Sequence, residues 1–152
     1  MKLEELNHKH FPDLFEVTKL SDPWLDLDRN TSDRLFSQRE GFVLVTNDNK
    51  VVGHITFDSY TPRLDIIIHC SVIPEYQKRW LTKAIYKQVF DKVFNDFECI
   101  RASGFAVEGL NDLTFHERLG FKLEGITRNG FRHFNNYYNV RSYGMLKNER
   151  RW

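Results

Sequence analysis

The stretch SVIPEYQKRWLTKAIYKQVFDKVFNDF, residues 71–97, decides the fold because it predicts a strand end, a tight turn and a helix in immediate succession. From Thr82 onward, apolar residues recur about every four positions with Lys and Asp between them, which is typical of an amphipathic helix. The apolar stripe consists of Ile85, Tyr86, Val89, Phe90, Val93, Phe94 and Phe97. A stripe of this kind needs a sheet to cover it.

The segment before the turn predicts that sheet. RLDIIIHCSVI, residues 63–73, is rich in β-branched residues and does not alternate cleanly with polar ones, as expected of a central strand buried on both faces. Pro74 ends the strand. The first N–H groups of the following helix have no partner within the helix, and the helix dipole favours an anion there. The sequence therefore predicts a place that could hold a diphosphate.

The rest of the chain predicts alternating short elements without repeats or linkers. Expected helices cover residues 11–20, a segment behind Thr31 or Ser32, and residues 113–119, which Gly120 caps. Expected strands cover residues 1–6, 41–46, 51–57, 99–105, 121–126 and 141–146. Together with the central strand and helix, these elements predict an α/β (α+β) fold with a β-meander.

Composition limits the classes of function. A chain of 152 residues that is 41% hydrophobic suits a single domain, residues 1–152. With 22 basic and 21 acidic residues, no overall field favours a nucleic acid or a membrane as partner. We expect a soluble, cytoplasmic protein, because no apolar run approaches the ~20 residues that span a bilayer and the N-terminus is too charged for a signal peptide. We expect Cys70 and Cys99 to be reduced thiols, because neither lies at a spacing typical of metal ligands.

At the predicted turn the sequence resembles the GNAT superfamily of acetyl-CoA-dependent N-acyltransferases, whose signature there is V-x-P-x-Y-[QR]-[KR]-[KR]-G-[ILV]-[GA]. Residues 72–82 read VIPEYQKRWLT. Trp80 and Thr82 stand where the family has small residues that let backbone amides approach the pyrophosphate of CoA, so the motif is degenerate. Trp80 either packs as a core plug or forms a pocket wall. The resemblance implies that acetyl-CoA binds through Ser71, Val72, Ile73, Gln77, Lys78, Arg79, Trp80, Leu81 and Thr82.

The resemblance extends from about residue 42 to the C-terminus. HERLGFKLEG, residues 116–125, is similar to the family's Y-E-K-L-G-F-x-x-E-G. YGML, residues 143–146, followed by Glu149, is similar to the ending of the ribosomal-protein and diamine N-acetyltransferase branch. The resemblance implies one GNAT-like domain with a mixed central β-sheet of about six to seven strands, flanked by about four helices.

Acyl transfer from a thioester to an amine needs a base for the amine and a proton for the departing thiolate. His116 stands where the family has the tyrosine that often supplies this proton, so the resemblance implies an acid there. Asp65 or His69 on the central strand, or His54 on the preceding one, is a candidate base. Each has a structural alternative: His116 as a partly exposed helix residue, the sheet histidines as partners of the backbone, and Asp65 as the ion-pair partner of Arg63.

Two functions fit these residues. The first is an acyltransferase that moves an acetyl group from acetyl-CoA to a primary amine on a protein N-terminus, a polyamine or a small molecule. The alternative is a non-catalytic GNAT-fold protein with a structural, assembly or binding role, such as a phage or virion component. The segment NGFRHFNNYYN, residues 129–139, combines aromatic and amide side chains and predicts a recognition loop or a contact with a second copy or another protein.

Overall fold

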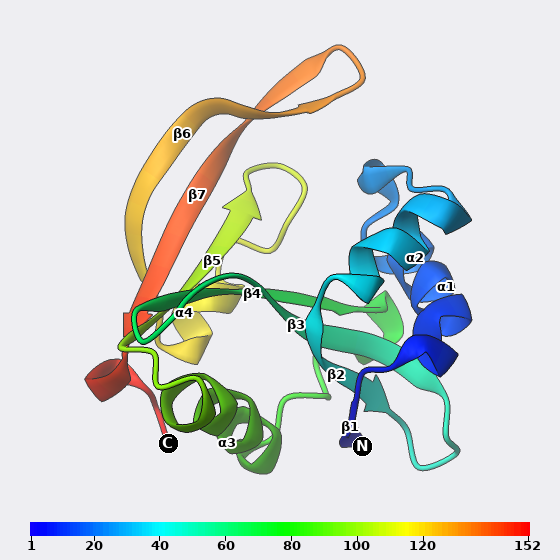
Figure 1. The fold of residues 1–152 in the computed structure, drawn as a ribbon. Helices are drawn as coiled ribbons and strands as arrows, with labels where there is room; N and C mark the ends of the chain where they lie inside the picture. The colour runs from blue at the N-terminus through cyan, green and yellow to red at the C-terminus, as the bar shows by residue number, and fades with distance from the viewer. The chain divides into compact units, whose positions relative to one another are not determined.

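The computed structural model describes residues 1–152 and contains a mixed seven-stranded sheet in the order β1-β2-β3-β4-β5-β7-β6 (Figure 1). Strand β4 runs parallel to β5, whereas β1 with β2, β2 with β3, β5 with β7 and β6 with β7 are antiparallel. This arrangement confirms the predicted α/β (α+β) fold. Its elements are β1 (Lys2–Glu5), α1 (Phe11–Ser21), α2 (Arg29–Ser37), β2 (Glu40–Val45), β3 (Val51–Thr61), β4 (Asp65–Val72), α3 (Lys83–Asp91), β5 (Arg101–Val107), α4 (Phe115–Leu119), β6 (Lys122–His133) and β7 (Asn136–Leu146).

The chain divides into two compact units. The first unit consists of residues 1–58 and 68–89, and the second of residues 59–67 and 90–152. That residues 1–152 make one domain stays a prediction. No helix is both long and apolar enough to cross a bilayer.

In the first unit, α1 and α2 pack beside each other and against β2 (Figure 1). Leu14 of α1, Phe36 of α2, and Val43 and Val45 of β2 form one buried cluster. Helix α2 begins earlier than the sequence predicted, because the side chain of Asp28 accepts a hydrogen bond from the Thr31 N–H at 2.7 Å and caps the helix. The cluster holds α1 and α2 against β2.

Strand β4 is less buried than its composition suggested. Of its residues only Ile66 and Val72 are fully buried, so the prediction of a strand buried on both faces was wrong. Successive side chains of a strand point to opposite faces, and Asp65, His69 and Ser71 fall on one of them. Their polar groups need hydrogen-bond partners, and an apolar core has none, so this face of β4 is only partly buried.

Helix α3 begins at Lys83, and Thr82 caps it. The Thr82 Oγ1 accepts a hydrogen bond from the Ile85 N–H at 3.2 Å. Trp80 is only 4% exposed, whereas the residues on either side of it, Arg79 and Leu81, are exposed. The tryptophan side chain therefore packs into the core, which was one of the two expected outcomes.

The second unit contains a long antiparallel hairpin of β6 and β7 (Figure 1). The sequence suggested a recognition loop at residues 129–139, but most of them belong to strands. Strand β6 continues to His133, and β7 starts at Asn136. Phe131 lies opposite Tyr138, and such cross-strand aromatic pairs stabilise a hairpin.

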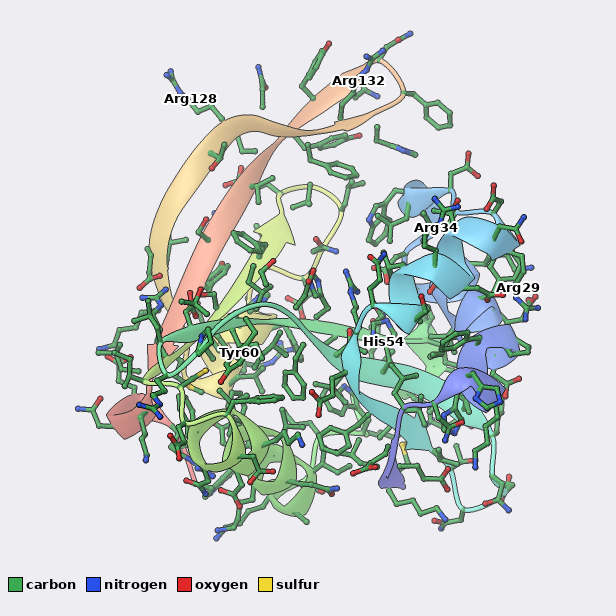
Figure 2. All side chains as sticks on the ribbon, viewed as in Figure 1. Arg29, Arg34, His54, Tyr60, Arg128 and Arg132 are labelled. Carbon is green, nitrogen blue, oxygen red and sulfur yellow. The ribbon has the colours of Figure 1, made fainter.

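The aromatic side chains at the end of this hairpin differ in exposure. Phe134 is 76% exposed and Tyr137 is 59% exposed, whereas Tyr138 packs beside Gly109. Arg128 and Arg132 also lie on the hairpin (Figure 2). A contact with a second copy or another protein through residues 129–139 stays a prediction.

Replacing Trp80 with Gly would restore the residue that the family motif has there, yet we expect it to destabilise this chain. Removal of a fully buried indole leaves a cavity, so the free energy of unfolding should fall by about 3–5 kcal/mol in urea denaturation. Trp80→Phe is the matched control and should cost less. Unchanged stability of the Gly variant would show that the indole is not part of the core.

Candidate functional site

The turn after β4 is anchored at the end of the strand. The Ile73 N–H donates to the Val52 carbonyl of β3 at 2.9 Å, and the Gln77 side-chain amide donates to the Val72 carbonyl at 3.0 Å. Gly53 allows the two strands to approach, because a Cβ at this position would lie 2.7 Å from the Ser71 carbonyl oxygen. These contacts fix where the strand ends and the turn begins.

The start of α3 presents a row of free backbone donors. The N–H groups of Leu81, Thr82, Lys83 and Ala84 make no hydrogen bond within the protein, and all four residues are exposed. Lys78 and Arg79 are exposed on the same turn. Free N–H groups at a helix N-terminus, with the helix dipole and nearby cations, favour a phosphate or diphosphate. This part of the chain therefore fits the pyrophosphate of CoA.

The two departures from the family motif leave these donors accessible. The side chain of Trp80 is buried while Leu81, Thr82, Lys83 and Ala84 are exposed, and no residue of the turn has a positive φ that would require glycine. Thr82 takes one donor, the Ile85 N–H, as its capping partner. The small residues are therefore not needed for this backbone path.

Of the candidate bases in the first unit, His69 lies in a polar cluster on β3 and β4. Its Nε2 is 3.4 Å from Asp58 Oδ2, in a geometry that makes no hydrogen bond, and Asp58 is also 3.6 Å from Arg39. Burial and the charge of Arg39 lower the pKa of His69, partly offset by Asp58. His69 is therefore neutral near pH 7, which is the state that a proton acceptor needs.

His54 is a structural residue of this cluster (Figure 2). Its ring is 3% exposed, packs edge-on against Phe36 with centroids 4.9 Å apart, and has Nδ1 3.4 Å from the Thr56 hydroxyl. Burial lowers its pKa to about 3, with the charges of Arg39 and His69 acting in the same direction. A ring this enclosed has no path to a substrate amine.

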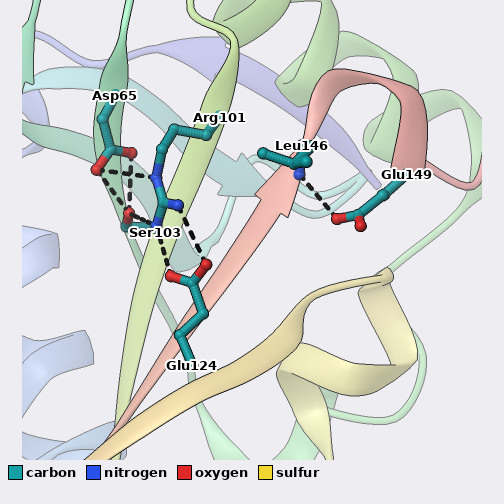
Figure 3. Close-up of polar contacts among 6 residues, drawn as sticks. All are labelled: Asp65, Arg101, Ser103, Glu124, Leu146 and Glu149. Carbon is teal, nitrogen blue, oxygen red and sulfur yellow. Dashed lines mark hydrogen bonds and ion pairs between the residues drawn. The ribbon is translucent and has the colours of Figure 1, made fainter.

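Asp65 belongs to a hydrogen-bonded network in the second unit (Figure 3). Both of its carboxylate oxygens accept from the Ser103 hydroxyl at 2.8 Å, and Oδ2 is 3.4 Å from the Arg101 guanidinium, which also binds Glu124. Arg63, the partner considered for Asp65, pairs with Glu98 instead. A base at Asp65 would first have to leave these partners.

His116 is held on α4 by aromatic contacts in the second unit. Its ring stacks on Tyr143 with centroids 4.7 Å apart and meets Phe121 edge-on. A Cβ at Gly104 would lie 2.5 Å from the His116 Nε2, so only glycine fits there. Its Nδ1 is buried without a hydrogen-bond partner. Burial lowers the pKa of His116 to about 4, although Asp112 acts in the opposite direction. The imidazole is therefore neutral at pH 7.

Sequence reasoning missed a carboxylate between the helices and the sheet of the first unit. Asp22, at the C-terminal end of α1, accepts hydrogen bonds from the Ser71 hydroxyl of β4 and, at 2.9 Å, from the Ser21 hydroxyl. Burial raises the pKa of Asp22, and the two hydroxyls offset this in part. The sequence marked Ser21-Asp22-Pro23 only as a break in the chain, because no local pattern pairs Asp22 with a residue of β4.

The two cysteines are free thiols. Burial, helped by the nearby charge of Asp22, raises the pKa of Cys70 to about 12, so this thiol carries no charge at neutral pH. Cys99 is buried, and its pKa is also raised. No group of three His, Cys, Asp or Glu side chains is arranged to hold a metal ion.

The model of the acetyltransferase (GNAT) family matches residues 3–121. The chain belongs to this GNAT family. No curated protein matches it.

Solved structures of GNAT proteins share its fold. A GNAT-family acetyltransferase from Bacillus anthracis has a TM-score of 0.74 at 18% identity, over 97% of this chain and 95% of that chain. A chimera of the Vibrio cholerae spermidine N-acetyltransferase and hSSAT has a TM-score of 0.80 at 15% identity, over 97% of each chain. The V. cholerae spermidine/spermine N-acetyltransferase with manganese ions has a TM-score of 0.76 at 15% identity, over 95% and 91%. Such identities show the fold alone.

We expect His116→Phe to reduce the acid sensitivity of folding. The pKa of His116 is about 4 when folded and near 6.5 when unfolded, so the unfolded state binds more protons between these values. This contribution to stability is complete above about pH 6.5 and is lost as the pH falls towards 4, by up to about 3 kcal/mol. Urea denaturation at pH 7, 6, 5 and 4.5 should show a smaller fall for the Phe variant. Identical pH slopes for the two proteins would contradict the buried neutral histidine.

Proposed function

We propose that this GNAT chain is an N-acetyltransferase that moves an acetyl group from acetyl-CoA to a primary amine. The observation that supports this most is the exposed row of unpartnered amides from Leu81 to Ala84, next to Lys78 and Arg79. Structural neighbours named as spermidine N-acetyltransferases make a polyamine the first acceptor to test. A small amine or a protein N-terminus has the same reacting group.

The chain's own groups would divide the work of binding the cofactor. Bound acetyl-CoA would supply the activated acetyl thioester. The free amides at the start of α3 would bind its pyrophosphate, with Gln77, Lys78 and Arg79 on the preceding turn. Backbone groups of Ser71 and Val72 are the candidates for the pantetheine arm, because the Ile73 N–H is already bonded to β3.

His116 fits a hydrogen-bond donor better than a full acid. Because its imidazole is neutral at pH 7, it can donate an N–H to negative charge that develops on the thiolate without transferring a complete proton. Of the candidate bases His69 and Asp65, His69 fits the role better, since it is neutral and has fewer hydrogen-bond partners. These roles are part of the proposal.

The alternative, a non-catalytic assembly or virion protein, gains no support from the comparisons, which return acetyltransferases. The buried position of Trp80 removes the main reason for it, because the indole does not cover the exposed amides of the turn. The enzyme is therefore the better-supported reading.

Acetyl-CoA should raise the melting temperature of the protein, and Lys83→Pro should weaken this effect. Proline is tolerated at the first position of a helix and removes one N–H of the proposed anion site. The residue that caps a helix, here Thr82, typically has the extended backbone that proline requires of the residue before it. We expect about 10- to 100-fold weaker binding in calorimetry, as for the loss of a hydrogen bond to a charged group.

Lys83→Ala is the matched control, because it removes the same charge but keeps the N–H. Weaker binding by the Pro variant than by the Ala variant isolates the backbone donor. If millimolar acetyl-CoA leaves the melting temperature of the unmodified protein unchanged, the acetyltransferase proposal is wrong, since any ligand of the native state stabilises it.

His116→Phe should lower kcat by roughly 10²–10³-fold, as for the loss of one donor to a developing anion, with little change in the affinity for acetyl-CoA. Because the histidine stays neutral, kcat of the unmodified enzyme should show no step near pH 6.5 that the variant lacks. Steady-state rates with spermidine between pH 6 and 9 test both statements. A fully active Phe variant would remove His116 from the reaction.

A further inference from the structure

The carboxylate of Asp22 has hydroxyl partners but no cationic one. Ser71 and Ser21 donate to the same oxygen, Oδ2, and no Lys, Arg or His lies within 4.0 Å of either oxygen. The thiol of Cys70, whose pKa the charge of Asp22 helps to raise, is uncharged at neutral pH. Asp22 is therefore a partly buried anion whose second oxygen, Oδ1, is free.

The backbone around Asp22 adds to the negative potential. Asp22 is the residue at the C-terminal end of α1, and its own N–H bonds the Thr18 carbonyl of the last turn. The C-terminus of a helix carries a partial negative charge and favours cations. Two independent features, the carboxylate and the helix end, thus favour a positive group at one place.

Asp22 is linked to the proposed cofactor site through its hydrogen-bond partner Ser71. Ser71 stands on β4 directly before Val72, where the strand passes into the turn that carries the exposed amides. Both belong to the first unit of the chain. Buried carboxylates usually have a cation or a metal as partner, and one without either is costly to the fold and typical of a functional site.

We infer that Asp22 binds the ammonium form of the acceptor amine and accepts its proton, with Ser71 as the residue that positions the carboxylate. Asp22 then takes the role of base in place of His69. This inference rests on the proposed function. It names the acceptor class: an alkyl ammonium group, as in a polyamine or a protein N-terminus.

One proton moves from the ammonium nitrogen to the Asp22 carboxylate, and the freed lone pair forms a bond to the acetyl carbon. The bond from that carbon to sulfur breaks, and the thiolate takes a proton that the acylated nitrogen loses. Asp22 then releases its own proton to solvent. The products are the N-acetyl amine, free CoA and one proton.

Asp22→Asn is the decisive variant, and Asp13→Asn, which removes an exposed carboxylate from the same helix, is its control. With spermidine and acetyl-CoA we expect kcat/KM of the Asp22 variant to fall by on the order of 10²–10⁴-fold, with unchanged binding of acetyl-CoA. The stabilisation by spermidine alone in a thermal shift assay should also disappear. The melting temperature of the unliganded variant at pH 7 should stay equal or rise, because an uncompensated charge has been removed.

Ser71→Ala keeps the carboxylate and provides a second, positional test. The Ser71 hydroxyl favours the ionised form of Asp22, so its loss should move the acidic limb of the kcat/KM profile to higher pH. If Asp22→Asn does not fold, this shift decides the question. An Asp22→Asn variant that acetylates spermidine normally, or an unmoved acidic limb in Ser71→Ala, overturns the inference.

The two proposals fail in different ways. If acetyl-CoA does not bind the unmodified protein but spermidine still stabilises it in an Asp22-dependent manner, the amine site stands and the acetyltransferase proposal falls. If acetyl-CoA binds and is used while Asp22→Asn behaves like Asp13→Asn and Ser71→Ala leaves the acidic limb unmoved, the acetyltransferase proposal stands and the amine site falls.

Discussion

The way β4 ends is the constraint on which the proposed site depends. Three attachments hold the chain there: the Ile73 N–H on the Val52 carbonyl, the Gln77 amide on the Val72 carbonyl, and the buried indole of Trp80. With these points fixed, residues 81–84 are exposed, and their N–H groups have no hydrogen-bond partner in the protein. Where the family has a conformationally free glycine, this chain has Trp80, whose buried side chain holds the turn against the core.

The part of the fold that depends on local periodicity could be predicted from the sequence. The four-residue spacing of apolar side chains in α3 and the glycine that ends α4 with a φ of 106° are local signals, and both correspond to the structure. The family resemblance at residues 72–82 also located the turn. What it could not supply was the direction of the Trp80 side chain, because burial of a single residue depends on the packing around it.

The errors have a shared cause: they concern residues whose partners lie on another element of the fold. Strand β4 contains as many β-branched residues as a fully buried strand, yet the polar partners of Ser71 and Asp65 come from residues 22 and 103. The aromatic and amide residues of 129–139 predicted a recognition loop or a contact, but the cross-strand pairing of Phe131 with Tyr138 extends the hairpin almost to its tip. Composition alone cannot predict such pairs, because a partner's position in the sequence is not periodic.

The two carboxylates of the first unit differ in what balances their charge. Asp58 has Arg39 and His69 within 4 Å, so a substrate ammonium would have to compete with a guanidinium that is already present. Asp22 has only the hydroxyls of Ser21 and Ser71, which orient a carboxylate without neutralising it. An added cation therefore gains more at Asp22. A lysine or arginine beside Asp22 would neutralise the carboxylate, but the resulting ion pair would occupy the place that we assign to the acceptor amine.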